Sequence, residues 1–341
     1  MKAVQLVEID KNLENKEIPV PEPKSDEVLI RIKAAGICHS DVHYRDGVSS
    51  VGYLPISLGH EVAGVIEELG SNVFDFKVGD RVCLNYMITC GKCKYCVQGT
   101  EQFCVEGKMI GKDIDGGYAE YIAVPTRGVY KLPSSISFEH ASVMMCSSST
   151  SLHALRKTRF KPGETLAIFG LGGLGISALQ LAKAFGARTI YAVDIDSNKL
   201  KTAEEMGAIP INAKEDDPVE EIMSLTKGDG VDVALELIGL SLTMDQGVRS
   251  LARFGRLGLV GITKASFDVN SYEVICREKE IVGVSDHLLS ELPCILDLAE
   301  QGKLDISKVV TKIVPLDADA INEVHHHLKE FNADFRTVIK P

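Results

Sequence analysis

From about residue 147 the chain alternates short apolar runs with helical patterns, and this alternation constrains the fold most strongly. Apolar strand-like runs occupy residues 165–170, 189–194, 231–239 and 256–261, with helical patterns over 174–186, 198–207 and 242–255. Such alternation predicts a parallel, doubly wound sheet, because each helix returns the chain across the sheet by a right-handed crossover. We therefore predict a Rossmann-type α/β domain over residues 149–285.

The flanking sequence has a different pattern. Short β-rich runs at residues 28–36, 61–69, 81–86 and 118–124 are separated by Gly, Pro and Asp, which is typical of an antiparallel β body with loop insertions. After residue 286 the alternation stops, and helical patterns over 290–303 and 317–331 precede a strand-like end. A chain of 341 residues is long enough for two domains. We predict that residues 1–148 and 286–341 together form the β-rich domain.

The charge balance narrows the range of partners. The 48 acidic side chains outnumber the 37 basic ones, for a net charge of -11. Such a surface repels phosphate backbones and anionic lipid, so we expect neither nucleic acid nor a membrane as partner. The longest uncharged run, Thr165–Ala182, approaches the length of a short membrane span. Its four glycines favour a buried strand–turn–helix instead.

The N-terminal sequence indicates a reducing compartment, and this determines how the cysteines are interpreted. The first ten residues mix charges with apolar residues and lack the apolar stretch of an export signal. We therefore expect a cytoplasmic protein, in which clustered thiols indicate metal binding or catalysis rather than disulfides.

A glycine-rich turn marks the expected dinucleotide site. Gly170, Gly172, Gly173 and Gly175 follow an apolar strand and open an apolar helix. The glycines allow a tight turn, close approach of backbone to a pyrophosphate, and close helix–strand packing. Asp194 ends the next strand, where a carboxylate accepts hydrogen bonds from the adenosine ribose and repels a 2′-phosphate. The sequence predicts NAD rather than NADP; the alternative role for Asp194, a helix N-cap, could instead fall to Asp196 or Ser197.

Four cysteines within 15 residues predict a closed metal site. Cys90, Cys93, Cys96 and Cys104 have the spacing of a tetrathiolate zinc centre within a lobe over residues 86–108. A closed site leaves no position for substrate, so this zinc is structural. The alternatives are unrelated thiols, an iron–sulfur cluster, or a zinc-ribbon nucleic-acid module, which the acidic net charge disfavours.

Three further residues suggest an open metal site. Cys38, His60 and Cys146 could supply three protein ligands and leave a fourth position for water or substrate, as in catalytic zinc sites. On spacing alone, the metal-site interpretation is no stronger than its alternative, in which each Cys is a small buried apolar residue and the His forms ordinary hydrogen bonds with its neighbours.

These elements together resemble a zinc-containing alcohol dehydrogenase of the medium-chain dehydrogenase/reductase family. The resemblance rests on CHSDVH from Cys38 to His43, GHE ending at Glu61, the four-cysteine lobe, and GLGGLG followed by Asp194. It covers the whole chain and implies a GroES-like catalytic domain, a Rossmann domain, and a homodimer or homotetramer. It implies two zinc ions, the catalytic one held by Cys38, His60 and Cys146, with Glu61 behind it. Asp41 matches the carboxylate that orients the ligand histidine.

The resemblance also implies the reaction. Zinc lowers the pKa of a bound alcohol, whose α-hydride passes to the nicotinamide of NAD, so that alcohols and aldehydes or ketones interconvert. Ser40 matches the first hydroxyl of a proton relay and His43 its exit base. Histidine suits that step because its ordinary pKa of about 6.5 lies near working pH.

Other residues correspond to cofactor contacts in the family. His39 and Arg336 match basic positions at the pyrophosphate. Lys199 matches a residue at the ribose, and Thr150 one at the nicotinamide. An exposed loop histidine, a surface salt bridge and a solvated helix lysine are the plainer alternatives for His43, Arg336 and Lys199.

Substrate class remains open. Cys146 favours alcohol over polyol dehydrogenases, which often carry Glu there; a polyol or sugar dehydrogenase and a semialdehyde reductase stay as alternatives. A non-catalytic NAD-binding or zinc-structural protein is a further alternative, but the metal ligands and the relay residues Ser40 and His43 would then have no role.

The remaining histidines and cysteines are not expected to form a site. His325, His326 and His327 cannot converge on one metal from consecutive helix positions, and we expect them on a partly exposed helix face. We expect Cys83, Cys276 and Cys294 at buried apolar positions.

Overall fold

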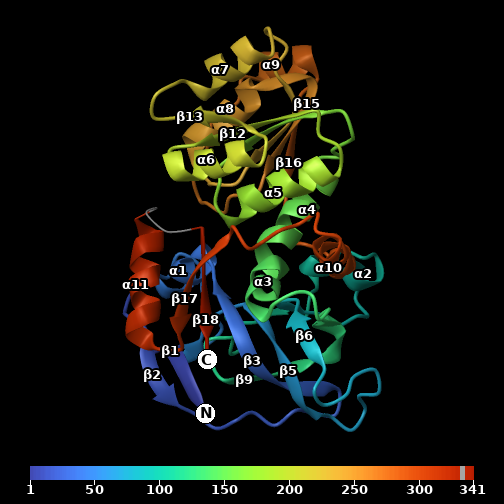
Figure 1. Cartoon of the computed structure of the whole chain (residues 1–341), viewed down its shortest axis with the longest axis vertical. Helices are drawn as coiled ribbons and strands as arrows, with labels where there is room; N and C mark the ends of the chain where they lie inside the picture. The colour runs from blue at the N-terminus through green and yellow to red at the C-terminus, as the bar shows by residue number, and fades with distance from the viewer. Residues whose placement is uncertain (331–334) are drawn as a thin grey trace. The chain divides into compact units, whose positions relative to one another are not determined.

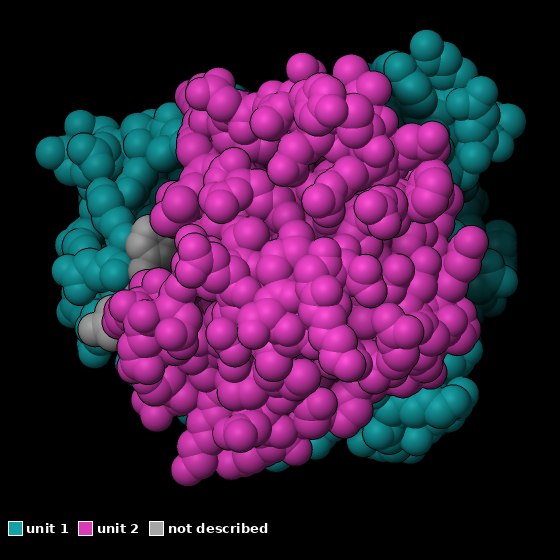
Figure 2. All heavy atoms as spheres, turned by 90° about the horizontal axis from the view of Figure 1, so that it is seen from above, with its two compact units in different colours: residues 1–149, 288–341 teal, residues 150–287 magenta. Residues whose placement is uncertain are grey.

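A computed structural model of the chain describes residues 1–330 and 335–341 and divides them into two compact units (Figures 1 and 2). Unit 1 comprises residues 1–149 and 288–341, and unit 2 comprises residues 150–287. The chain therefore leaves unit 1 once and returns to it.

Unit 1 is built on sheets whose strands pair antiparallel, except for one parallel pair formed by the last two strands of the chain. Its strands are β1 (Lys2–Leu6), β2 (Glu14–Glu17), β3 (Glu27–Ile37), β4 (Ile56–Ser57), β5 (Glu61–Leu69), β6 (Arg81–Leu84), β7 (Met87–Ile88), β8 (Lys108–Met109), β9 (Tyr121–Pro125), β10 (Val129–Lys131), β17 (Val310–Pro315) and β18 (Arg336–Lys340). The largest sheet has the order β10-β6-β5-β3-β18-β17, with β9 also paired to β3. The C-terminal strand β18 lies antiparallel to β3, so the end of the chain completes the sheet of the N-terminal segment.

The sequence of β3 explains its central place. Nine of the eleven residues of β3 are buried, because both faces of the strand are covered by apolar neighbours.

The described helices of unit 1 are α1 (His39–Arg45), α2 (Lys94–Val97), η1 (Glu101–Phe103), η2 (Thr126–Gly128), α3 (Phe138–Val143), η3 (Met144–Ser148), η4 (Leu289–Glu291), α10 (Leu292–Glu300) and α11 (Ala318–Lys329). Residue 331, the expected end of the last helix, lies outside the described residues.

Unit 2 is the predicted doubly wound domain. Its strands are β11 (Thr165–Phe169), β12 (Thr189–Asp194), β13 (Ile209–Asn212), β14 (Val231–Glu236), β15 (Leu251–Leu259) and β16 (Glu280–Gly283). They form one parallel sheet in the order β13-β12-β11-β14-β15-β16, the strand order of a Rossmann fold. The helices are α4 (Ser149–Lys157), α5 (Gly173–Ala184), α6 (Ser197–Glu205), α7 (Pro218–Leu225), α8 (Ser241–Arg249) and α9 (Ser271–Arg277). All five residues of β11 are buried, as expected for a strand covered on both faces.

Several sequence-based expectations were wrong in detail. The helix expected to run to residue 255 ends at Arg249, and β15 begins at Leu251. Phe254 adopts φ 62°, a left-handed conformation that no helix continues through. His325 is fully buried rather than on an exposed helix face, although His326 and His327 are exposed. Cys276 is exposed rather than buried.

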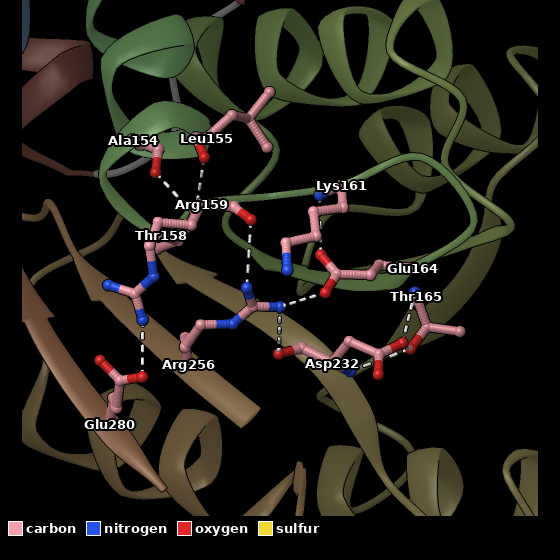
Figure 3. Close-up of polar contacts among 10 residues, drawn as sticks. All are labelled: Ala154, Leu155, Thr158, Arg159, Lys161, Glu164, Thr165, Asp232, Arg256 and Glu280. Carbon is pink, nitrogen blue, oxygen red and sulfur yellow. Dashed lines mark hydrogen bonds and ion pairs between the residues drawn. The ribbon is translucent and has the colours of Figure 1, made fainter. Parts of the chain in front are cut away.

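A polar network links the starts of β11 and β14 to Arg256 in the middle of β15 (Figure 3). The Arg256 guanidinium pairs with Glu164 at 2.5 Å and donates to the carbonyl oxygen of Arg159 at 3.1 Å. Asp232 accepts from both the backbone N–H and the hydroxyl of Thr165. These bonds provide partners for the buried Thr165 hydroxyl and for both terminal nitrogens of the buried Arg256 guanidinium.

Among the described helices, none combines the length and apolarity needed to cross a bilayer.

Candidate functional site

The four cysteines of the lobe converge as the sequence predicts. The ligand atoms of Cys90, Cys93, Cys96 and Cys104 all lie within 4.8 Å of one another. Cys93 and Cys96 are 3.6 Å apart and Cys90 and Cys96 4.0 Å apart, measured between sulfurs. Zinc–sulfur bonds of about 2.3 Å imply sulfur–sulfur edges of about 3.8 Å in a tetrahedron. The donor set therefore fits a structural zinc ion.

Backbone hydrogen bonds favour the thiolate form at two of these sulfurs, Cys90 and Cys93, whereas desolvation raises the pKa of Cys96 to about 12. The Cys90 N–H donates to Cys104 Sγ at 3.3 Å, and the Cys93 N–H donates to Cys90 Sγ at 3.4 Å. Donation from the backbone N–H groups of Cys96 and Val105 lowers the pKa of Cys93 to about 6. Hydrogen bonds to the charged form favour that form, which is the form that binds metal.

A second donor set lies deep in unit 1. Ligand atoms of Cys38, His60, Glu61 and Cys146 also lie within 4.8 Å of one another, and all four residues are buried. Cys38 precedes α1, His60 precedes β5, and Glu61 begins β5. Fold topology, rather than local sequence, therefore brings these residues together.

Cys146 reaches this cluster from an unusual turn. It lies in η3, a π-helical turn between α3 and α4 in which Met144–Ser148 are all buried. A π turn inserts an extra residue and rotates the side chains that follow it, and such turns occur often at functional sites. A hydrogen bond from the Cys146 thiol, opposed by burial, holds the pKa of Cys38 well below its ordinary value. The pair therefore presents a thiolate to a cation.

Asp41 orients His60 from behind. One carboxylate oxygen lies 3.2 Å from His60 Nδ1, and the other accepts from the Cys38 N–H at 2.9 Å. Burial opposes the charged imidazole, but the facing Asp41 carboxylate still raises the pKa of His60 above its ordinary value. With Nδ1 engaged, Nε2 is the nitrogen available to a metal. This is the arrangement that metal-ligating histidines typically have.

Glu61 pairs with Arg336, a contact that the sequence analysis did not anticipate. An Arg336 guanidinium nitrogen donates to Glu61 Oε2, with both side chains buried. Burial raises the pKa of Glu61 to about 7 in spite of the opposing charge of Arg336. Arg336 thus reaches the cluster itself, and its expected contact with a pyrophosphate stays a prediction.

The expected relay residues lie on α1. Ser40 Oγ is 3.7 Å from Cys38 Sγ. The rings of His39 and His43 meet edge to face with centroids 4.9 Å apart, and both side chains are half-buried. Burial, reinforced by the neighbouring His43, lowers the pKa of His39. The ring of Tyr86, absent from the predicted site, meets His60 edge to face at 5.2 Å.

The glycine-rich turn has the geometry of a dinucleotide site. Gly170 adopts φ 98°, and a Cβ at Gly175 would lie 2.0 Å from the Gly170 carbonyl oxygen. A Cβ at Gly172 would meet nothing within 4 Å, so open space faces the start of α5. An anion there would meet the N–H groups of the first helical turn.

Asp194 lies beside this turn at the end of β12. It accepts from the Leu171 N–H at 2.6 Å and from the Ile195 N–H at 2.7 Å. Asp196, not Asp194, caps α6. Lys199 is half-buried in the first turn of α6, and Thr150 is buried near the start of α4.

Comparison with known proteins shows the family. The family described as "Alcohol dehydrogenase GroES-like domain" matches residues 24–134, and "Zinc-binding dehydrogenase" matches residues 173–301. An NAD-dependent alcohol dehydrogenase of Sulfurisphaera tokodaii is 39% identical, covering 100% of both chains. A sorbitol dehydrogenase of Bacillus subtilis is 36% identical, covering 86% of this chain and 84% of its own. The crystal structure of an alcohol dehydrogenase from Aeropyrum pernix superposes with a TM-score of 0.92 at 35% identity, covering 100% of both chains.

The chain belongs to the zinc-containing alcohol dehydrogenases of the medium-chain dehydrogenase/reductase family. The resemblance inferred from its motifs is confirmed.

Proposed function

We propose that the protein is a zinc-dependent oxidoreductase that transfers a hydride between an alcohol and NAD, interconverting alcohols with aldehydes or ketones. The buried cluster of Cys38, His60 and Cys146, backed by Glu61 and Asp41, carries this proposal. Its two thiols and one imidazole suit zinc, and three ligands leave a fourth position for substrate.

The groups that the chain would hold have complementary chemistry. Zinc at this cluster would supply Lewis acidity toward an alcohol oxygen, and NAD would supply a hydride acceptor. The chain's own task is to hold both and to carry away one proton.

Ser40 is placed to begin that proton transfer. Its hydroxyl lies beside Cys38 Sγ, and Oγ can accept a proton from substrate while donating its own onward. His43 lies one turn further along α1 and is half-buried, so its ring can pass the proton to solvent. We assign Ser40 the relay hydroxyl and His43 the exit base.

The glycine-rich turn of unit 2 and several single residues are assigned to cofactor binding. Gly170, Gly172, Gly173 and Gly175 would admit the pyrophosphate at the start of α5, and Asp194 would accept from the ribose hydroxyls. Lys199 would support the ribose, Thr150 the nicotinamide, and His39 and Arg336 the pyrophosphate. A carboxylate at residue 194 supports NAD over NADP.

The substrate class is proposed as an alcohol without further definition. Relatives named alcohol dehydrogenase support this, and Cys146 in place of Glu agrees with it. The similarity to a sorbitol dehydrogenase keeps polyol or sugar oxidation as a second candidate, and semialdehyde reduction as a third.

We also propose a homodimer or homotetramer in the cytoplasm. β16 is an edge strand of the unit 2 sheet with Ile281 exposed, and Tyr272 and Ile275 of nearby α9 are more than 70% exposed. An exposed edge with apolar side chains favours pairing with a second copy. Two thiolate clusters without disulfides support a reducing compartment.

The test is NADH formation at 340 nm with primary, secondary, cyclic and polyhydroxy alcohols, each with NAD and NADP, with and without a zinc chelator. Chelator-sensitive oxidation of simple alcohols with NAD is the expected result. Turnover restricted to polyols would favour the second candidate. Silence in both directions from protein that binds zinc and NAD would refute the alcohol assignment.

A further inference from the structure

Behind Asp41 lie two buried polar residues that the proposed reaction does not use. The Tyr118 hydroxyl donates to Asp41 Oδ2 at 3.0 Å, and His325 Nε2 of α11 lies 3.4 Å from the same hydroxyl. Tyr118 and His325 are both fully buried. A row of polar groups therefore runs from His60 through Asp41 and Tyr118 to α11.

Hydrogen-bond accounting fixes the direction of this row. A phenol has one proton, which Tyr118 gives to the Asp41 carboxylate, so its oxygen can only accept from His325. His325 must then carry its proton on Nε2. Burial lowers the pKa of His325 to about 4, which keeps the ring neutral with a single N–H. Among the described residues, its Nδ1 has no hydrogen-bond partner, so the ring makes its one polar contact toward Tyr118.

The same accounting fixes the state of His60. The Asp41 carboxylate accepts from the Cys38 N–H and the Tyr118 hydroxyl, and it likewise accepts from His60, so Nδ1 of the imidazole carries the proton between them. Nε2 is then the His60 nitrogen that can offer a lone pair to a metal. The His325 N–H polarises the Tyr118 hydroxyl, which bonds to Asp41; this stabilises the carboxylate charge and fixes the direction in which Asp41 faces His60.

The packing around Gly59 shows that the Tyr118 ring is held against the ligand segment. Gly59, immediately before His60, adopts φ 90°. A Cβ there would lie 2.3 Å from Tyr118 Cδ1 and 2.5 Å from Cε1. The ring thus occupies the space that any other residue at 59 would fill, and it limits movement of the backbone that carries His60.

We propose that Tyr118 and His325 are positioning residues of the metal centre, which fix the orientation of Asp41 and through it the tautomer and direction of His60. The inference rests on the proposed function, because it assumes that His60 binds zinc. It assigns no contact between either residue and substrate or metal.

The test compares Tyr118→Phe with Tyr130→Phe. Both changes remove one hydroxyl from unit 1, but the Tyr130 hydroxyl donates to the Leu289 carbonyl oxygen and belongs to neither metal cluster. Zinc content and zinc affinity are measured on full-length protein by competition with a chromophoric chelator. The absorption spectrum of the Co²⁺-substituted protein reports the ligand geometry.

Tyr118→Phe is expected to weaken the affinity for the zinc held by Cys38, His60 and Cys146 about 10–100-fold and to shift the Co²⁺ bands, as loss of an outer partner of a metal ligand typically does. The four-cysteine zinc and the Tyr130→Phe protein should be unaffected. His325→Leu should weaken zinc in the same direction, and His325→Gln should restore it, because the Gln side-chain N–H can replace Nε2–H.

Two results would overturn the inference: unchanged zinc affinity and Co²⁺ bands in Tyr118→Phe, or equal losses in Tyr118→Phe and Tyr130→Phe. Failure of the proposed function looks different, because the wild-type protein would then bind only one zinc ion per chain.

Discussion

Replacing Asp194 with Ala should reverse the cofactor preference. The carboxylate lies at the end of β12, where it accepts from the N–H of Leu171 in the glycine-rich turn. In the proposed complex the same carboxylate accepts from ribose hydroxyls. Alanine removes the acceptor and the negative charge together, so binding of NAD weakens while a 2′-phosphate is no longer repelled.

The size of the change follows from these two contributions. Hydrogen bonds to a charged group contribute about 1.5–3 kcal/mol, which is roughly a 10–150-fold loss of kcat/KM for NAD. Two unit charges 4 Å apart repel by about 1 kcal/mol in water and about 4 kcal/mol near a protein surface. Removing that repulsion improves kcat/KM for NADP by about fivefold or more. The ratio of kcat/KM values should therefore move toward NADP by about 50-fold or more.

The assay is initial-rate NADH or NADPH formation at 340 nm with one alcohol at a fixed saturating concentration. Asp196→Ala is the matched control, because Asp196 caps α6 by accepting from the N–H groups of Asn198 and Lys199. Loss of the cap should cost about 1 kcal/mol of stability and leave the cofactor ratio unchanged. A ratio that stays within about twofold of wild type in Asp194→Ala, or that moves equally in both variants, would refute the reasoning.

Three further predictions concern proton transfer and stability. His43→Ala should slow alcohol oxidation below neutral pH, with recovery on addition of imidazole buffer; a pH–rate profile without recovery would exclude the relay role. Glu164→Gln should lower the free energy of unfolding by about 3 kcal/mol, because it leaves the buried Arg256 guanidinium without its charged partner, whereas Arg249→Met at an exposed pair should cost under about 1 kcal/mol in urea titrations. Because burial lowers the pKa of His325 to about 4, the unfolded chain binds a proton there between about pH 6.5 and 4 that the folded chain does not. The free energy of unfolding therefore decreases as the pH decreases. Between pH 7.5 and 5 the wild type should lose about 2 kcal/mol more of it than His325→Leu, and equal losses in the two proteins would contradict this.

The fold of unit 2 followed from its sequence wherever strands were long and apolar. β13 and β16 were missed because they are only four residues long, and β13 contains Pro210. The start of β15 was assigned to a helix because residues 250–255 continue the apolar spacing of α8. Its strand conformation depends on pairing with β14, which is a tertiary contact.

The parts of the site that could be predicted from the sequence are likewise those that depend on local patterns rather than on tertiary contacts. The four-cysteine lobe is local, so spacing alone indicated it. Spacing alone made the grouping of Cys146 with Cys38 no stronger than its alternative, because more than 100 residues separate them, and the family resemblance decided between the two interpretations. The contacts of Tyr118 with His325 and of Glu61 with Arg336 span 207 and 275 residues. No local pattern encodes such pairs.

The measurement that tests the central claim most directly is zinc content alongside NADH formation in the wild type, in Cys146→Ala, and in Cys294→Ser as a control outside both clusters. The account predicts two zinc ions per chain and alcohol oxidation for the wild type and Cys294→Ser, and one zinc ion without oxidation for Cys146→Ala. Full activity and two zinc ions in Cys146→Ala would contradict it.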